Sequence, residues 1–311
     1  MNKTCILGSL NMDIVLKVET MAKVGETIFA KSLATIPGGK GANQAVAAKR
    51  MGSDVSIIGK VGLDSNGDFL VRELERNCIN TDYIFRDNKE STGTAIINVN
   101  REGNNSIVVV AGANMNISED EIKKSYSIIK SSDVIIAQFE TPSEITMEAF
   151  IYAKSHGIIT ILNPAPAKKI DNELFKYTDI IIPNETEAYE LTGILVEDLK
   201  SAKKAADNFI AKGVNYIIIT LGSKGAALIT KEKSEIIPAI KVNAIDTTAA
   251  GDSFIGAVSS KLGAVELNYE NLKKAIVFAN KVSSIVVQRS GAQPSIPTMK
   301  EVIDIYGEDI N

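Results

Sequence analysis

The sequence predicts an α/β fold, in which a doubly wound, mostly parallel sheet carries a small antiparallel β lid. From about residue 130 onward, short apolar runs alternate with amphipathic segments. The runs are continuous and rich in β-branched residues, a pattern typical of parallel strands that are covered on both faces. The alternation of strands with helices then indicates a doubly wound sheet. With 311 residues, of which 45% are apolar, the chain is long enough for one large α/β domain.

The main sheet is expected from four apolar runs and the helices between them. The expected strands are residues 133–137, 158–162, 179–182 and 216–220. A capping-box pattern from Ser118 to Glu121 predicts a helix start. Further helices are expected at residues 142–155, 197–212, 250–262, 270–287 and 298–306. Ligands of such sheets bind outside the carboxyl ends of the strands, so the residues that directly follow these strands are candidates for a binding site.

A second group of strands predicts the lid. Residues 12–18, 27–36, 94–100 and 106–110 read as strands without a helix between partners, and residues 101–105 read as a hairpin loop. We expect a lid formed from about 12–36 and 94–110, inserted into a single domain of residues 1–311. A helix at 41–51 and a strand at 55–60 would return the chain to the core.

Charge and residue usage exclude several classes of protein. The net charge of -4 argues against a broad basic face for nucleic acid. Cys5 and Cys78 are the two cysteines, and neither has a metal-ligand spacing. The single histidine, His156, fits the C-terminal cap of a helix rather than a catalytic triad. No uncharged apolar stretch approaches the ~20 residues of a membrane helix, so we expect a cytoplasmic protein without nucleic-acid or membrane partners.

Residues 249–254, Ala-Ala-Gly-Asp-Ser-Phe, place small residues just before a helical pattern. Open backbone N–H groups at a helix N-terminus bind anions. Asp252 could simply cap this helix, because carboxylates stabilise the first turn. It could also lie beside a phosphate site and take a proton from an attacking hydroxyl. The spacing by itself leaves both interpretations open.

Three other segments are candidates for ligand binding. Residues 38–44, Gly-Gly-Lys-Gly-Ala-Asn-Gln, are either a tight turn or a backbone approach to a polyhydroxyl ligand, with Lys40 and Asn43 as donors. Residues 184–187, Asn-Glu-Thr-Glu, are either a helix cap or a site for hydrated Mg²⁺ beside ATP. Residues 220–225, Thr-Leu-Gly-Ser-Lys-Gly, are either a glycine hairpin or a nucleotide loop built from backbone amides. No Walker A loop, dinucleotide fingerprint or nucleophile elbow is present.

Taken in order, these motifs resemble those of the phosphofructokinase-B-type, or ribokinase-like, carbohydrate kinase family. The resemblance extends from residues 7–13 to residues 291–295, and its most specific motifs are at 38–43 and 246–254. The motifs at 91–93, 163–166 and 183–187 narrow it towards the ribose kinases of that family. The resemblance implies an α/β core with a β lid, and a homodimer in which the lid sheets of two chains clasp each other.

The resemblance also implies a role for each motif residue. Asp252 would be the catalytic base, and the backbone amides of Ala249, Ala250, Gly251 and Asp252 the anion hole. The sugar-binding residues would be Asn11, Asp13, Gly39, Lys40, Gly41, Asn43, Glu140 and Asp252. The nucleotide-binding residues would be Asn184, Thr220, Gly222, Ser223, Gly225, Gly251 and Asn280. Glu187 would act on Mg²⁺ through water. Asn280 departs from the family pattern, since a histidine often stands there near adenine.

A potassium-like monovalent cation usually activates the family. The matching positions, several of which would ligate through main-chain carbonyls, are Asp246, Thr248, Val286, Arg289, Gly291 and Ser295. The implied reaction converts ATP and D-ribose to ADP and D-ribose 5-phosphate, with Mg²⁺ and K⁺ as cofactors. A kinase for deoxyribose, fructose or a nucleoside on the same scaffold is the alternative, and a sugar-binding protein without activity is a second one.

Overall fold

The computed structural model describes residues 2–168, 171–263 and 265–308. Its larger sheet has nine strands in the order β13-β12-β11-β10-β9-β8-β1-β4-β5. All neighbours from β11 to β5 pair in parallel, and β12 and β13 extend the sheet in antiparallel fashion. The strands are β1 (Lys3–Leu7), β4 (Asp54–Gly62), β5 (Asn80–Asp87), β8 (Val134–Ala137), β9 (Ile159–Leu162), β10 (Ile180–Ile181), β11 (Tyr216–Thr220), β12 (Ala226–Ile229) and β13 (Ser234–Ile237).

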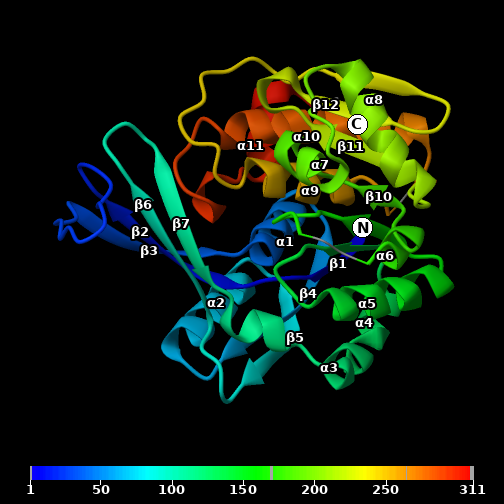
Figure 1. Ribbon diagram of the computed structural model, residues 1–311. Coiled ribbons are helices and arrows are strands. Elements are labelled where there is room, and N and C mark those ends of the chain that lie inside the picture. The colour runs from blue at the N-terminus through cyan, green and yellow to red at the C-terminus, as the bar shows by residue number, and fades with distance from the viewer. Residues whose placement is uncertain (1, 169–170, 264, 309–311) are drawn as a thin grey trace.

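Helices cover both faces of this sheet (Figure 1). Successive strand residues point to opposite faces, so Ile6 of β1 packs into one buried cluster while Cys5 and Leu7 pack into the other. One face is covered by α1 (Lys40–Arg50), α2 (Ser65–Arg76), α9 (Ala250–Ser260), α10 (Tyr269–Val286) and α11 (Met299–Tyr306). The other is covered by α3 (Glu119–Lys124), α4 (Tyr126–Lys130), α5 (Ser143–Ser155), α6 (Glu173–Lys176), α7 (Glu185–Thr192) and α8 (Leu199–Ala211). The doubly wound prediction is confirmed.

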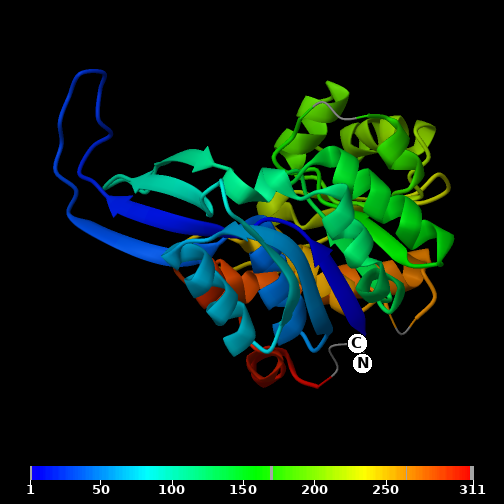
Figure 2. The same cartoon turned by 90° about the horizontal axis from the view of Figure 1, so that it is seen from below.

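The lid is a separate four-stranded sheet in the order β3-β2-β6-β7, formed by β2 (Asn11–Lys17), β3 (Ser32–Gly38), β6 (Gly93–Val99) and β7 (Asn105–Val110). It projects beyond the body of the molecule, with the β2–β3 connection farthest out (Figure 2). The predicted small sheet is confirmed, and its two outer pairs are antiparallel. Its central pair, β2 with β6, is parallel. The reason is that β2 and β6 follow β1 and β5, which run in the same direction through the main sheet.

The strands and helices that were expected from residue 130 onward are all present, with ends that differ by a few residues. The predicted strand at 27–36 is shorter, since β3 begins at Ser32. Helix α2 and strand β5 were not predicted. His156 caps α5, as expected, and its Nδ1 lies 2.9 Å from the Tyr152 carbonyl oxygen. Within residues 2–168, 171–263 and 265–308, no helix is long and apolar enough to cross a membrane. The single-domain organisation stays a prediction.

Candidate active site

The candidate site lies where the strand order reverses, because β1 has β4 on one side and β8 on the other. This is the position at which open α/β sheets bind ligands. A pocket of about 210 Å³ opens beside this point, at the carboxyl ends of β9, β10 and β11. Its lining comes from five segments of the chain: Lys40, Asn163, Ala165, Ile182, Asn184, Glu187, Thr220, Thr247, Ala249, Gly251, Asp252 and Ile255.

Asn11, at the start of β2, is held in place by a second asparagine. Asn114 donates from Nδ2 to Asn11 Oδ1 at 2.8 Å, and its own Oδ1 accepts from the Leu10 N–H at 2.9 Å. Both asparagines are buried, with exposed fractions of 4% and 1%. The Asn11 oxygen thus has a partner within the protein. The amide nitrogen is the group that remains available to a ligand. Asn114 was not predicted. It lies shortly after β7, where the chain leaves the lid.

Asp13 lies two residues further along β2 and pairs with Ile36 of β3, while its carboxylate lies beside Gly38. A Cβ atom at Gly38 would lie 2.2 Å from Asp13 Oδ2, so only glycine fits there. Burial, together with the negative charges of Glu140 and Asp252, raises the pKa of Asp13 to about 7. Its surroundings therefore disfavour the charged form of this carboxyl group.

Glu140 and Lys40 complete the charged part of the site. The Glu140 carboxylate accepts from the Ser9 hydroxyl and, at 3.3 Å, from the Lys40 backbone N–H. Burial would lower the pKa of Lys40, but the surrounding carboxylates, Asp252 and Glu140 first, raise it above its ordinary value. The Lys40 ammonium group is therefore kept charged. It lies among carboxylates that were predicted to bind the sugar, Asp13 and Glu140, and the one predicted to act in phosphoryl transfer, Asp252.

Asp252 occupies the first turn of α9, and its carboxylate is held by two amides of α1. Asn43 Nδ2 donates to Oδ2 and Gln44 Nε2 donates to Oδ1, each at 3.0 Å. The sequence pattern identified Asn43 as a donor but left Gln44 without a role. Gln44 is itself bonded to Gln138 and Asn163, which follow β8 and β9. Gln138 and Asn163 could have been proposed from the sequence, because ligands of such sheets bind just outside the carboxyl ends of the strands.

The N-terminus of α9 has an unusual backbone. Ala249, the residue before the helix, adopts φ 57° and ψ 10°, a left-handed conformation that is uncommon for a residue with a Cβ atom. Such conformations are concentrated at functional sites. A Cβ atom at Gly251 would meet nothing within 4 Å, so open space lies directly in front of this helix end. An anion can therefore approach the N–H groups of this turn, of which the Ala250 N–H also donates to the Thr247 carbonyl oxygen at 3.2 Å.

The nucleotide-side candidates lie on the far side of the pocket. Asn184 caps α7, its backbone N–H and its Nδ2 donate to the two oxygens of Glu187, and its Oδ1 accepts from the Glu187 N–H. Thus the helix-cap interpretation is confirmed, and the pocket lining includes both residues. Burial raises the pKa of Glu187. Thr220 pairs with Asn184 across the sheet edge, and Gly222 and Ser223 after it are exposed.

Asn280 lies apart from these residues. Its Nδ2 donates to the carbonyl oxygens of Pro238 at 3.0 Å and Ile237 at 3.3 Å, and 7% of the residue is exposed. The side chain therefore closes the loop after β13, and its amide oxygen is the group left for a ligand.

The cation candidates form a loop beside α9. The Asp246 carboxylate accepts from the Gly291 N–H at 2.8 Å and the Thr248 N–H at 2.9 Å. Burial opposes the ionised form, but these hydrogen bonds hold the pKa of Asp246 below its ordinary value. The side chains of Val286 and Ser295 are buried, and Arg289 donates to Glu301 at 2.8 Å. The Ser295 hydroxyl donates to the Ala292 carbonyl oxygen at 2.7 Å and Val286 has no polar side-chain atom, so these positions could offer a cation their backbone carbonyls.

The comparisons with known proteins agree with this arrangement. Residues 1–299 match the model of the pfkB family of carbohydrate kinases. The chain belongs to this family. It is 46% identical over 302 residues to the ribokinase of Staphylococcus aureus, covering 97% of this chain and 98% of the relative. It is 38% identical over 300 residues to the deoxyribokinase of Salmonella typhi, covering 95% and 96%.

A solved structure supports the same assignment. The Arabidopsis thaliana ribokinase complexed with ribose and ATP superposes with a TM-score of 0.89 at 32% identity, over 98% of this chain and 99% of that one. The fold prediction and the family prediction are confirmed, and the protein is an enzyme of the kinase class. The alternative of a sugar-binding protein without activity is not supported.

Proposed function

We propose that this kinase transfers the γ-phosphoryl group of ATP to the 5-hydroxyl of D-ribose. The observation that carries the proposal is the position of Asp252. Its carboxylate lies at the open N-terminus of α9, and its charge acts on both Asp13 and Lys40. A proton acceptor, an anion-binding helix end and a cluster of hydroxyl-binding carboxylates therefore meet at one place.

The proposed chemistry is a single in-line displacement without a phosphoenzyme. Asp252 takes the proton of the sugar hydroxyl while the hydroxyl oxygen forms a bond to the γ-phosphorus. The bond between that phosphorus and the bridging oxygen breaks, and ADP leaves. The N–H groups of Ala249, Ala250, Gly251 and Asp252 would stabilise the charge on the transferred group, and Lys40 would balance it.

The sugar would be bound by polar groups that are buried or half-buried. Asn11 offers its amide nitrogen, and Asp13 and Glu140 offer carboxylate oxygens, while Gly39, Gly41 and Asn43 close around it. The relatives named ribokinase and the Arabidopsis complex with ribose support D-ribose as the acceptor. The deoxyribokinases support deoxyribose as a second candidate at lower identity.

The nucleotide would lie against Asn184, Thr220, Gly222, Ser223 and Gly225, with Asn280 near the base. Glu187 fits a role on Mg²⁺ through water, because it is a carboxylate on the wall of the same pocket as Asp252. Mg²⁺ would neutralise phosphate charge.

A monovalent cation would be held beside the anion hole by Asp246, Thr248, Val286, Arg289, Gly291 and Ser295. Among the described residues, no three His, Cys, Asp or Glu side chains gather as a metal site. Carbonyl oxygens would therefore supply most ligands, which suits K⁺. Its chemistry would be electrostatic support of the backbone shared with the anion hole.

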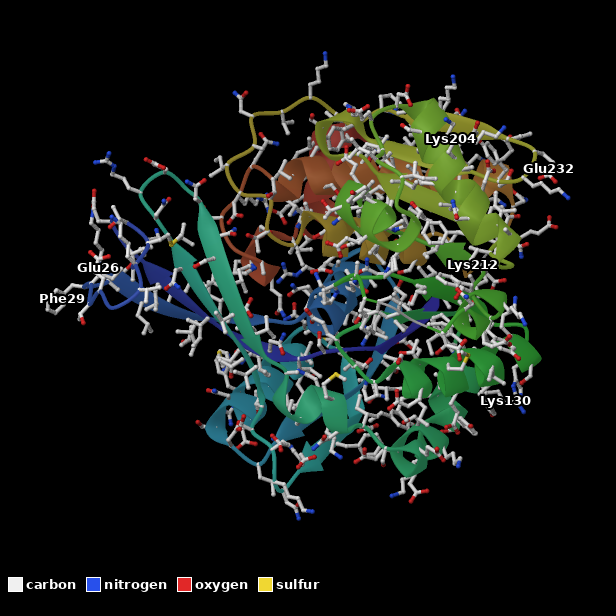
Figure 3. The ribbon with its side chains drawn as sticks, in the orientation of Figure 1. Glu26, Phe29, Lys130, Lys204, Lys212 and Glu232 are labelled. Atoms are coloured by element: carbon white, nitrogen blue, oxygen red, sulfur yellow. The ribbon has the colours of Figure 1, made fainter. Side chains whose placement is uncertain are left out.

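A homodimer through the lid is also proposed. The edge strand β7 exposes Ile107 and Val109 on one face and Val108 and Val110 on the other, each by at least 50%. Phe29, at the outer end of the lid, is 93% exposed (Figure 3). Apolar surface of this extent is typical of an interface, and a second lid sheet would cover it. The expected cytoplasmic location stays a prediction.

One assay tests the proposal. ATP consumption is measured with ribose, deoxyribose, fructose and a panel of nucleosides, each with K⁺ and with Na⁺ as the salt. We expect the highest kcat/KM for ribose and a higher rate in K⁺. If another acceptor has the highest kcat/KM, that acceptor takes the place of ribose in the proposal. If the rates in K⁺ and Na⁺ are equal, the proposed cation site is wrong.

A further inference from the structure

A chain of buried amide side chains connects the main sheet to Asp252. Gln138 Nε2 donates to Gln44 Oε1 at 2.7 Å. Gln44 Nε2 then donates to Asn163 Oδ1 at 3.1 Å and to Asp252 Oδ1 at 3.0 Å. Gln44 and Gln138 are fully buried, and Asn163 is 5% exposed. Four segments of the chain, α1, α9 and the ends of β8 and β9, thus meet at one amide group.

The direction of these hydrogen bonds follows from one end of the chain. Asn163 Nδ2 donates to the Ile182 carbonyl oxygen at 3.1 Å, and a carbonyl can only accept. Asn163 must therefore present its oxygen to Gln44, and Gln44 must present its amide nitrogen. That nitrogen has two hydrogens, and the second one is directed at Asp252. The orientation of Gln44 is thus set by the backbone of the main sheet.

Helix α1 packs closely against α9 at the level of Gln44. A Cβ atom at Gly256 of α9 would lie 2.6 Å from Ala47 Cβ and 2.8 Å from the Gln44 carbonyl oxygen. The two helices therefore pack with their backbones in close contact at the level of Gln44. This fixes the distance between the Gln44 amide and the first turn of α9, where Asp252 lies.

An aspartate needs such support to act as a directed base. The torsion that sets the plane of its carboxylate is intrinsically broad, so the helix by itself does not decide where the oxygens face. We propose that Gln44 is a positioning residue for Asp252, with Gln138 and Asn163 holding Gln44 in the orientation that donates. The inference rests on the proposed base role of Asp252. Two amide donors on two different oxygens leave a lone pair on each oxygen, and they fix the plane in which that pair lies.

The test is a double-mutant cycle of Gln44→Met and Asp252→Asn in the full chain. Methionine keeps the length of the side chain but removes the donor. In the wild-type background, we expect kcat to fall about 10- to 100-fold, the effect of losing a hydrogen bond to a charged group. The KM values for sugar and ATP are expected to stay within about threefold. In the Asp252→Asn background, the same change is expected to lower kcat less than about twofold, because the group it positions is gone.

A second variant covers the case in which Gln44→Met folds poorly. Gln138→Met removes only the hydrogen bond that holds Gln44, and we expect a smaller loss of kcat, about three- to tenfold, that is likewise absent beside Asp252→Asn. Asn2→Leu is the matched control. It removes a buried amide that donates to the Ser259 carbonyl oxygen. Asn2 directly precedes β1, at the end of the strand away from the candidate site. The variant is therefore expected to lower the melting temperature while kcat stays within about twofold.

The outcomes separate the two proposals. If Gln44→Met and Gln138→Met keep wild-type kcat while Asp252→Asn loses it, the positioning role is wrong and the base role stands. If Gln44→Met lowers kcat equally with and without Asp252, the amide chain is structural and the inference fails. If Asp252→Asn itself keeps wild-type activity, the base role fails, and the positioning role fails with it.

Discussion

The two halves that we propose for the active site, a sugar side and a nucleotide side, are built in different ways. On the sugar side, Asn11 is buried and tied to Asn114, and Asp13 is enclosed by Gly38. On the nucleotide side, Gly222 and Ser223 are exposed, and a Cβ atom at Gly222 would meet nothing within 4 Å. On the sugar side, hydrogen bonds within the chain hold the side chains in place. On the nucleotide side, the backbone of Gly222 and Ser223 is exposed.

The difference follows from what each half must distinguish. A small sugar is recognised by hydroxyl groups, and buried polar groups that lack a partner discriminate strongly against the wrong analogue. Phosphates are recognised by charge, which backbone N–H groups and a helix end supply without side chains. Changes on the sugar side should therefore alter specificity, and changes on the nucleotide side should alter affinity for ATP. Asp252 belongs to both halves.

The largest effect is expected at this shared residue. Asp252→Asn removes the proton acceptor, and general-base catalysis typically contributes about 10²–10⁴-fold, so kcat should fall by that amount. Sugar and ATP should still bind, as calorimetry would measure. Asparagine has one oxygen for two amide donors, so Asp252→Ala is the companion variant. A kcat within tenfold of wild type for both variants would remove Asp252 from the base role.

The next effect is expected on the sugar side. Glu140→Gln keeps the shape but removes a charged acceptor, so the KM for the sugar should rise about 10- to 100-fold with a smaller change in kcat. The KM for ATP should not change. Glu144→Gln is the matched control, because Glu144 is exposed and lies on α5 outside the site. An equal rise in both KM values would contradict the division of the site into two halves.

The nucleotide side should show the converse pattern. Glu187→Gln keeps the cap of α7, since a glutamine oxygen can still accept from Asn184. The KM for Mg-ATP should rise by about tenfold, while the KM for the sugar stays within about twofold. Glu190→Gln, an exposed residue of the same helix, serves as the control. A selective loss of sugar affinity would place Glu187 in the other half.

The smallest effect is on stability and depends on pH. The pKa of Asp13 rises from about 3.8 to about 7 on folding. Between these values the folded chain binds a proton that the unfolded chain releases, so the free energy of unfolding falls as pH increases and is lowest above pH 7. Asp13→Asn removes this penalty.

The Asp13→Asn variant should therefore melt a few degrees higher than wild type at pH 8 and at nearly the same temperature at pH 4. Asp207→Asn, on the exposed face of α8, should shift neither value. The stabilised variant should also lose sugar affinity. Equal melting shifts at the two pH values would show that burial of the Asp13 charge does not limit stability.

The strands of the main sheet could be predicted because local pattern and burial agree there. Ile217, Ile218 and Ile219 are fully buried, as their continuous apolar run indicates. The lid was harder to delimit, since β3 is mostly exposed and residues 27–31, which precede it, have a strand-like composition but lie outside the strand. The parallel pairing of β2 with β6 depends on the directions of β1 and β5, which no local pattern contains.

The sequence by itself determined the fold class, the family and the order of the motifs, because each is carried by residues close together in the chain. Asn184 illustrates the limit, since its pattern left a helix cap and a site beside ATP both open, and the structure shows it at the cap of α7 and on the wall of the pocket. Only the tertiary structure decided which amides reach Asp252. Gln44, Gln138 and Asn163 lie 94 and 119 residues apart, counted from Gln44. They meet because parallel strands end at one edge of the sheet and Gly256 brings α1 against α9.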